Sequence, residues 1–327
     1  MPPSANHLAL ANSTRVSGGR RPRDLRRPHG ACANRPRVSL DEARARVKHS
    51  PTTLATGAAR VVVWILLPAV VPPAAVSLGR RKVALDDPTR WVFNRIADVY
   101  DARPAYPPGL IDALVALAPG RRVGDLGAGI GHVTLPLAER GFEVSAIEPA
   151  QAMLDRLRTR AREGRLKVHA IHATAEALPL DDAGLDLAVV ADALHFLDAE
   201  LVAKEIARAL APKGALAIVN CELGKTPFMR SLVEIIEGAV PRRPRKVDQN
   251  LIQVSAITGV RFAPARRFHD ETPVDCDTLE RILRSISFIG PAMNPVRFSA
   301  FRARVHALPG RPTWARVFTL CAGRRRG

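Results

Sequence analysis

Short, mostly apolar runs alternate with longer amphipathic stretches through the middle of the chain. The apolar runs at 123–126, 142–147 and 185–191 each stop at a glycine, an acidic residue or a polar loop. Such runs are typical of parallel strands that are buried on both faces. The stretches 132–140 and 150–162 have helical composition. The alternation predicts an α/β fold with a Rossmann-like, doubly wound, mostly parallel sheet.

The same two patterns continue toward the C-terminus. Further strands are predicted at 166–171 and 215–220, and a helix is predicted over 228–237. Two more helices follow, separated by the Gly-Pro pair at 290–291. The stretch 313–321 has strand composition, which predicts that it returns to the sheet as part of a last hairpin.

The chain divides by composition at about residue 85. Residues 1–85 hold 15 Lys and Arg against 3 Asp and Glu, a net charge of +12, which leaves +6 for the rest. This composition predicts a disordered leader and a folded domain over 86–327. Within the folded domain we expect a helical N-terminal cap (86–120), a cofactor-binding core (121–222), a C-terminal helical insertion on the substrate side (223–310), and a final strand with a basic tail (311–327).

Within the leader, residues 61–79 contain no charge, and 19 such residues are just enough to cross a bilayer. Prolines at 68, 72 and 73 interrupt a helix there. The stretch is therefore either a membrane segment or part of a disordered or non-native extension. The four cysteines are widely separated and form no C-x-x-C pair, which fits a reducing compartment and predicts a cytoplasmic protein.

A glycine-rich turn follows the first predicted strand. Gly127, Gly129 and Gly131 lie between this strand and the next helix, and Glu148 ends the second strand. Glycine permits positive φ and lets a ligand approach the bare backbone. Ligands of open α/β sheets bind beyond the carboxyl ends of the strands. A carboxylate placed there can accept hydrogen bonds from both hydroxyls of a ribose, so the turn predicts a ligand that contains a nucleoside.

The spacing of this turn distinguishes between ligands. A dinucleotide site prefers G-x-G-x-x-G, whereas here the third glycine comes one residue early and Asp125 precedes the first by two positions. The D-L-G-A-G-I-G pattern resembles motif I of the class I S-adenosylmethionine-dependent methyltransferases, of the methyltransferase type 11-like group. The resemblance implies S-adenosylmethionine as cofactor. It implies a binding site made of Asp125, Gly127, Ala128, Gly129, Gly131, Glu148, Thr174, Ala175 and Ala191, in which the Thr174-Ala175 pair would contact the adenine. The guanidinium of Arg103 suits a carboxylate, either that of the methionine moiety of the cofactor or that of the substrate.

Two further segments bear on the acceptor. The run F-x-x-x-A-x-x-Y-D-x-R-P-x-Y-P, which includes Arg103, is similar to the cap of small-molecule methyltransferases like the trans-aconitate enzyme. The chain lacks the Asn/Asp-Pro-Pro-aromatic motif after the fourth strand that enzymes methylating base amines use. Both observations, with the near-balanced charge of the domain, predict a small-molecule acceptor rather than a nucleic acid.

The predicted reaction is methyl transfer by in-line displacement, which relies on positioning and requires neither a nucleophilic side chain nor a metal. A base is needed only if the acceptor must lose a proton. His195, after the fourth strand, is the candidate catalytic base, or else it is a wall of the pocket; Asp192 is the alternative base. Two other functions fit the same residues: an NAD(P)-dependent oxidoreductase and a non-catalytic S-adenosylmethionine-binding protein.

Overall fold

The computed structural model describes residues 90–241, 245 and 247–325, which belong to the second of the two units, Ala75–Gly327, into which the chain's contacts divide. The predicted leader and its apolar stretch 61–79 lie outside the described residues. Over the described ranges, no helix is both long and apolar enough for a membrane span. The domain boundaries and the cytoplasmic location stay predictions.

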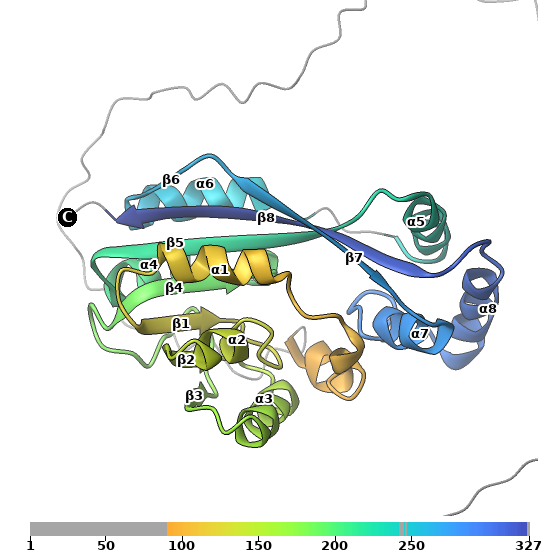
Figure 1. Ribbon diagram of the computed structural model, residues 1–327, viewed down its shortest axis with the longest axis horizontal. Helices are drawn as coiled ribbons and strands as arrows, with labels where there is room; N and C mark the ends of the chain where they lie inside the picture. Colours follow the sequence, from red (N-terminus) through yellow and green to blue (C-terminus); the bar gives the residue numbers. More distant parts are fainter. Residues whose placement is uncertain (1–89, 242–244, 246, 326–327) are drawn as a thin grey trace, which may run out of the picture. The chain divides into compact units, whose positions relative to one another are not determined.

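A largely parallel sheet forms the centre of the described region (Figure 1). The order is β3-β2-β1-β4-β5-β8-β6, with β7 paired to β8. β1 to β5 are parallel, whereas β8 is antiparallel to β5. The described strands are β1 (Arg122–Leu126), β2 (Glu143–Ile147), β3 (Val168–Ile171), β4 (Leu185–Ala191), β5 (Leu210–Leu223), β6 (Val260–Phe262), β7 (Arg266–Pro273) and β8 (Thr313–Arg325). The doubly wound sheet predicted from the sequence is confirmed.

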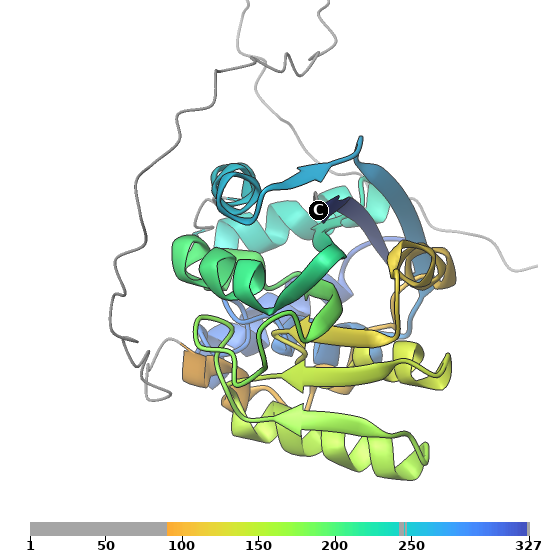
Figure 2. The same cartoon turned by 90° about the vertical axis from the view of Figure 1, so that its left-hand side faces the viewer.

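Helices cover both faces of the parallel strands, because those strands are apolar on both sides. α1 and α2 pack on one face against β1 and β4, and α4 and α6 pack on the other (Figure 2). The described helices are α1 (Pro108–Leu117), α2 (Thr134–Glu139), α3 (Gln151–Glu163), α4 (Ala199–Ala209), α5 (Pro227–Ala239), α6 (Val247–Thr258), α7 (Cys276–Arg284) and α8 (Pro295–His306).

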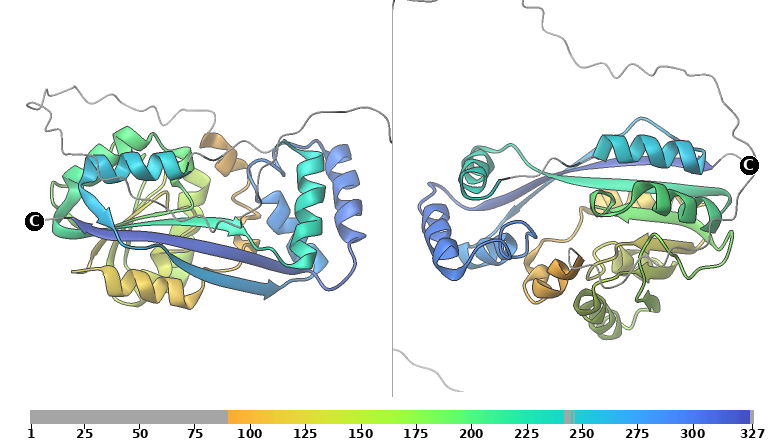
Figure 3. Two further views of the ribbon diagram at one scale, coloured as in Figure 1. Left: turned by 90° about the horizontal axis from the view of Figure 1, so that it is seen from above. Right: turned by 180° about the vertical axis from the view of Figure 1, so that it is seen from behind.

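A second apolar cluster lies at the far end of the long antiparallel strands. β5 and β8 extend beyond the parallel sheet, and α5, α7 and α8 gather around Trp314 and Ala315 at the start of β8 (Figure 3). The predicted helices around the Gly-Pro pair at 290–291 and the predicted last strand are confirmed. This arrangement brings the C-terminal helices to the edge of the sheet where the parallel strands end.

The N-terminal cap differs from the helix that the sequence predicts. It consists of two short 3-10 turns, Arg90–Arg95 and Tyr100–Ala102. The Asn94 side chain accepts a hydrogen bond from the Ala152 amide (2.9 Å) and so caps α3 instead of supporting its own helix. Ile96 and Ala97 are buried against the glycine turn and α3, as their apolar spacing predicts. The cap is therefore docked on the cofactor side of the sheet.

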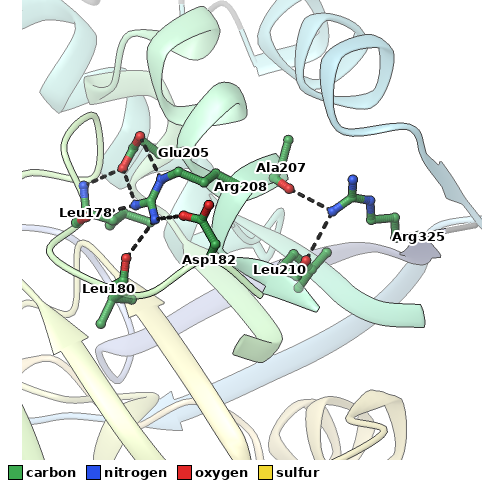
Figure 4. A network of polar contacts seen from close by, with 8 residues as sticks. All are labelled: Leu178, Leu180, Asp182, Glu205, Ala207, Arg208, Leu210 and Arg325. Carbon is green, nitrogen blue, oxygen red and sulfur yellow. Dashed lines mark hydrogen bonds and ion pairs between the residues drawn. The ribbon is translucent and has the colours of Figure 1, made fainter. Parts of the chain in front are cut away.

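Arg208 ties α4 to the loop between β3 and β4 (Figure 4). Its guanidinium donates to the carbonyl oxygens of Leu178 (2.9 Å) and Leu180 (2.7 Å) and pairs with Glu205 (2.7 Å). Glu205 in turn accepts from the Leu178 amide (2.8 Å). The loop held in this way also carries the predicted adenine contacts.

We expect Arg208→Ala to lower the free energy of unfolding by about 2–3 kcal/mol, because several partly buried hydrogen bonds are lost together. Arg325 is the matched control, since it donates only to the carbonyl oxygens of Ala207 and Leu210. Its replacement by alanine should cost about 1 kcal/mol. Urea denaturation measures both values. Equal losses in the two variants would contradict the role assigned to Arg208.

Candidate functional site

Two cavities meet where the parallel strands end. The first, of about 120 Å³, is lined by the glycine turn, Glu148 and the start of the cap, and we call it the loop cavity. The second, of about 770 Å³, is lined by β5, α5, the segment around 286–288 and the cap, and we call it the large cavity. Residues that line both are Tyr100, Arg103, Tyr106, His132, Asp192, Arg245, Ile286 and Phe288. These shared residues form the junction.

The glycine turn gives the loop cavity its floor. Gly127 has a φ of +81°, and a Cβ there would lie 2.7 Å from that of Ala193, so only glycine fits. Gly129 has a φ of +55°, and no protein atom lies within 4 Å of where its Cβ would be. The backbone at Gly129 thus faces open space in the cavity, as expected for a ligand that lies on bare backbone. Gly131 is not a lining residue; its missing side chain makes room for Leu135 and Leu157.

Glu148 connects the second strand to this turn. Its Oε2 accepts from the Gly129 amide (2.8 Å) and its Oε1 accepts from the Ala150 amide (2.9 Å). The side chain is buried yet lines the loop cavity. A carboxylate at such a position can accept hydrogen bonds from the hydroxyls of a ligand. The position suits the predicted ribose contact.

Asp125 lies beneath the turn at the end of β1. It is buried, and its Oδ2 accepts from the Thr134 hydroxyl (2.6 Å). Burial raises the pKa of this carboxyl to about 6, while the Thr134 hydrogen bonds act in the opposite direction. Asp125 lines the loop cavity together with Ala128 and Ala191, and their contact with the cofactor stays a prediction.

Arg103 is held at the junction by the C-terminal part of the chain. Its Nε donates to the Ser285 hydroxyl (2.8 Å), its Nη2 to the Ser285 carbonyl (2.8 Å), and its Nη1 to the Tyr100 hydroxyl (3.0 Å). The guanidinium also stacks on the Tyr100 ring at 4.2 Å. The fork is thus fixed toward both cavities, where it can meet a carboxylate.

Asp192 and Arg245 close the opposite side of the junction. Asp192 has a φ of +49°, and its Oδ1 accepts from Arg245 (3.3 Å) and from the Cys221 amide (3.4 Å). Burial raises the pKa of Asp192, and the charges of Arg245 and Arg103 oppose that rise. Arg245 was not predicted as a site residue, because it reaches the site from the distant segment before α6.

His195 lines the loop cavity but not the large cavity. It belongs to the 3-10 turn Leu194–Phe196, and its ring lies 4.0 Å from that of Phe196. Burial and then the charge of Arg245 lower the pKa of His195 to about 4, so the imidazole is neutral near neutral pH. The predicted catalytic role stays a prediction.

Thr174 and Ala175, the predicted adenine contacts, are buried and line neither cavity. The Thr174 hydroxyl oxygen has no hydrogen-bond partner within the described part of the chain. A buried hydroxyl without a partner is costly, and a ligand edge carrying a polar group would satisfy it. Their role in binding stays a prediction.

His132 was not predicted as a site residue. It follows the last glycine of the turn and lines both cavities. Its ring stacks on Tyr100 (6.0 Å between centroids) and contacts Tyr106 (5.9 Å). Burial, with the charges of Arg160, Arg103 and Arg316, lowers the pKa of His132 to about 3. Its position directly after the glycine turn is the sequence feature that could have indicated a site residue.

The chain is similar to several known proteins. Residues 124–218 match the family described as methyltransferase domain. The uncharacterized methyltransferase Rv3342 of Mycobacterium tuberculosis is 44% identical over 146 residues, which are 44% of this chain and 58% of that protein. The 23S rRNA (uracil(1939)-C(5))-methyltransferase RlmD of Halomonas elongata is 47% identical over 74 residues, 23% of this chain and 14% of that enzyme.

Among solved structures, YcgJ protein from Bacillus subtilis is 18% identical, with a TM-score of 0.47, over 67% of this chain and 97% of that one. In the matches to Rv3342 and RlmD, the chain spans less than two thirds of the length of the curated relative.

The doubly wound sheet, the glycine turn and Glu148 define an α/β domain that binds a nucleoside-containing ligand at its carboxyl edge. More narrowly, residues 124–218 match a methyltransferase domain, in agreement with the class I S-adenosylmethionine-dependent methyltransferase that motif I resembles. S-adenosylmethionine is the cofactor of that class, and the motif I resemblance of the sequence is confirmed.

Proposed function

We propose that this chain transfers a methyl group from S-adenosylmethionine to a small molecule. The observation that carries the acceptor class is the large cavity of about 770 Å³, which shares its junction residues with the loop cavity. A cavity of this size matches a small-molecule site. The match to an rRNA methyltransferase covers only 14% of that enzyme, so it bears on the cofactor core and not on the acceptor.

The described residues fit the cofactor at three points. Open space at Gly129 admits a ligand to the backbone, and the Glu148 carboxylate lines the same cavity, where a ribose would lie. The orphaned Thr174 hydroxyl lies in the loop after β3, where the resemblance places adenine. When bound, S-adenosylmethionine supplies a methyl group on a positively charged sulfur. Arg103 and Asp192 are placed to orient the two reactants at the junction.

In such a displacement the protein contributes mainly by holding the reactants in line, which can be worth an effective molarity of about 10⁵ M or more. The cap packs on the glycine turn and on α3, beside the loop cavity. Arg316, buried at 5% exposure, fastens the cap to β8 by donating to the carbonyl oxygens of Pro104 and Ala105.

Differential scanning fluorimetry with S-adenosylhomocysteine and with NADH tests the cofactor. We expect S-adenosylhomocysteine to raise the melting temperature and NADH to leave it unchanged, because only a ligand that binds the folded state stabilises it. The reverse result would favour the oxidoreductase. Untargeted mass spectrometry of a metabolite extract, incubated with the protein and S-adenosylmethionine, then tests for a methylated small molecule. Binding without any product would favour the non-catalytic alternative.

The proposed role of His195 as base has a pH signature. A base must be neutral to accept a proton, so kcat should rise with pH through about 4 and be flat from about pH 6 to 8. His195→Gln should lower kcat by about 10²–10⁴-fold. The measurement is the pH–rate profile of both proteins at saturating cofactor. Similar plateaus in the two profiles would remove His195 from the reaction.

A further inference from the structure

A continuous column of aromatic rings in contact crosses the junction between the two cavities. Successive members lie 4.2–6.0 Å apart, and an arginine covers each end. In order, the column is Arg103, Tyr100, His132, Tyr106, Phe318 and Arg316. These contacts connect the cap, the glycine turn and β8, and the His132 ring in the centre contacts both Tyr100 and Tyr106.

The polar groups at the junction fall into two kinds. Arg103, Tyr100, Asp192 and Arg245 all have hydrogen-bond partners within the protein. Within the described part of the chain, the His132 ring nitrogens and the Tyr106 hydroxyl have none. His132 lines both cavities, so its nitrogens can be reached from either side. Polar groups that line a cavity and have no protein partner are available to hydrogen-bond a ligand there.

The two unpartnered groups have complementary chemistry. A neutral imidazole carries one nitrogen that can accept a hydrogen bond, and the lowered pKa of His132 keeps it neutral. Burial raises the pKa of Tyr106 well above its ordinary value, so its hydroxyl stays protonated and is a donor. Side by side, they suit a ligand group that both donates and accepts.

We propose that His132 binds the methyl acceptor by accepting a hydrogen bond from its nucleophilic O–H or N–H, with the Tyr106 hydroxyl as the neighbouring donor. The inference rests on the proposed function and adds a class of acceptor: an alcohol, phenol or neutral N–H compound. His132 is then a substrate contact that orients the nucleophile toward the loop cavity, separate from the proton-accepting role predicted for His195.

The test removes the hydrogen-bonding atoms of His132 and Tyr106 and, where possible, keeps an aromatic ring in place. His132→Phe retains an aromatic ring between Tyr100 and Tyr106 but has no nitrogen, and His132→Gln restores an acceptor without the ring. Tyr106→Phe removes only the hydroxyl. Activity is measured as transfer from tritiated S-adenosylmethionine to the low-molecular-weight fraction of a cell extract, titrated by dilution. S-adenosylhomocysteine affinity is measured by calorimetry, and folding by thermal denaturation.

For His132→Phe we expect transfer at sub-saturating extract to fall by about 10- to 100-fold, with part of the loss recovered in His132→Gln. The Kd of S-adenosylhomocysteine should stay within about threefold of that of the wild type.

Wild-type transfer in a folded His132→Phe protein would overturn the inference. So would a Kd at least tenfold weaker with transfer restored at saturating cofactor, since the imidazole would then contact the cofactor. If His132→Phe does not fold, full transfer by His132→Ala would overturn the inference, and a 10- to 100-fold loss there would support it. Absence of transfer by the wild type would instead remove the proposed function, and this inference with it.

Discussion

We expect Gly129→Val to weaken the binding of S-adenosylhomocysteine strongly while the domain stays folded. Valine at this position would have to adopt a φ near +55°, a backbone conformation that is unfavourable for a β-branched residue. Its side chain would also enter the open space of the loop cavity, where the protein offers no other atom within 4 Å. Calorimetry should show a loss of at least about 100-fold in affinity, equivalent to about 2.7 kcal/mol.

A matched control separates the backbone strain of valine at a positive φ from the steric block of the loop cavity by its side chain. Gly259 also has a positive φ, +69°, and open space around its missing side chain, but it lies between α6 and β6, away from both cavities. Gly259→Val should cost similar stability and leave the affinity unchanged. Equal affinity in Gly129→Val and the wild type would show that the glycine turn is not the cofactor site.

The second large effect is expected at Glu148. Glu148→Ala removes the carboxylate that accepts from the Gly129 and Ala150 amides, so the variant loses the ribose contacts and also the support of the turn. Hydrogen bonds to a charged group are worth about 1.5–3 kcal/mol each. We therefore expect S-adenosylhomocysteine to bind at least about 10- to 100-fold more weakly.

Two further variants isolate the cause at Glu148. Glu148→Gln keeps the size and one acceptor oxygen, so its affinity should lie between those of the wild type and Glu148→Ala. Glu143→Ala removes the same charge from the exposed start of the same strand and should not change the affinity. Unchanged calorimetric affinity in Glu148→Ala would disprove the ribose contact.

The parallel half of the fold was predictable because its signal is local. Strands such as β4 are apolar over their whole length, and its predicted bounds agree with the structure. β7 was missed because its residues, Arg266–Pro273, are mostly charged or exposed and it pairs only along β8. α6 was missed for a related reason: only Val254 and Thr258 of its residues are buried. Its periodicity is correspondingly weak.

The candidate site likewise has a part that is local in the sequence and a part that only tertiary folding brings together. The glycine turn and Glu148 come from one continuous stretch of sequence, so their spacing alone predicted that they meet. The Ser285 contacts of Arg103 span 182 residues and depend on where the C-terminal helices pack. Arg245 likewise reaches the junction only through tertiary folding. No local sequence pattern predicts contacts between residues so far apart in the chain.

The most direct measurement is the fate of tritiated methyl groups from S-adenosylmethionine incubated with the full-length protein and a whole-cell extract. The extract is then separated into small molecules, protein and RNA, with Gly129→Val as the inactive control. Our account predicts label in the small-molecule fraction, formed together with S-adenosylhomocysteine by the wild type and not by the variant. Label confined to RNA or protein, or equal labelling by both proteins, would contradict it.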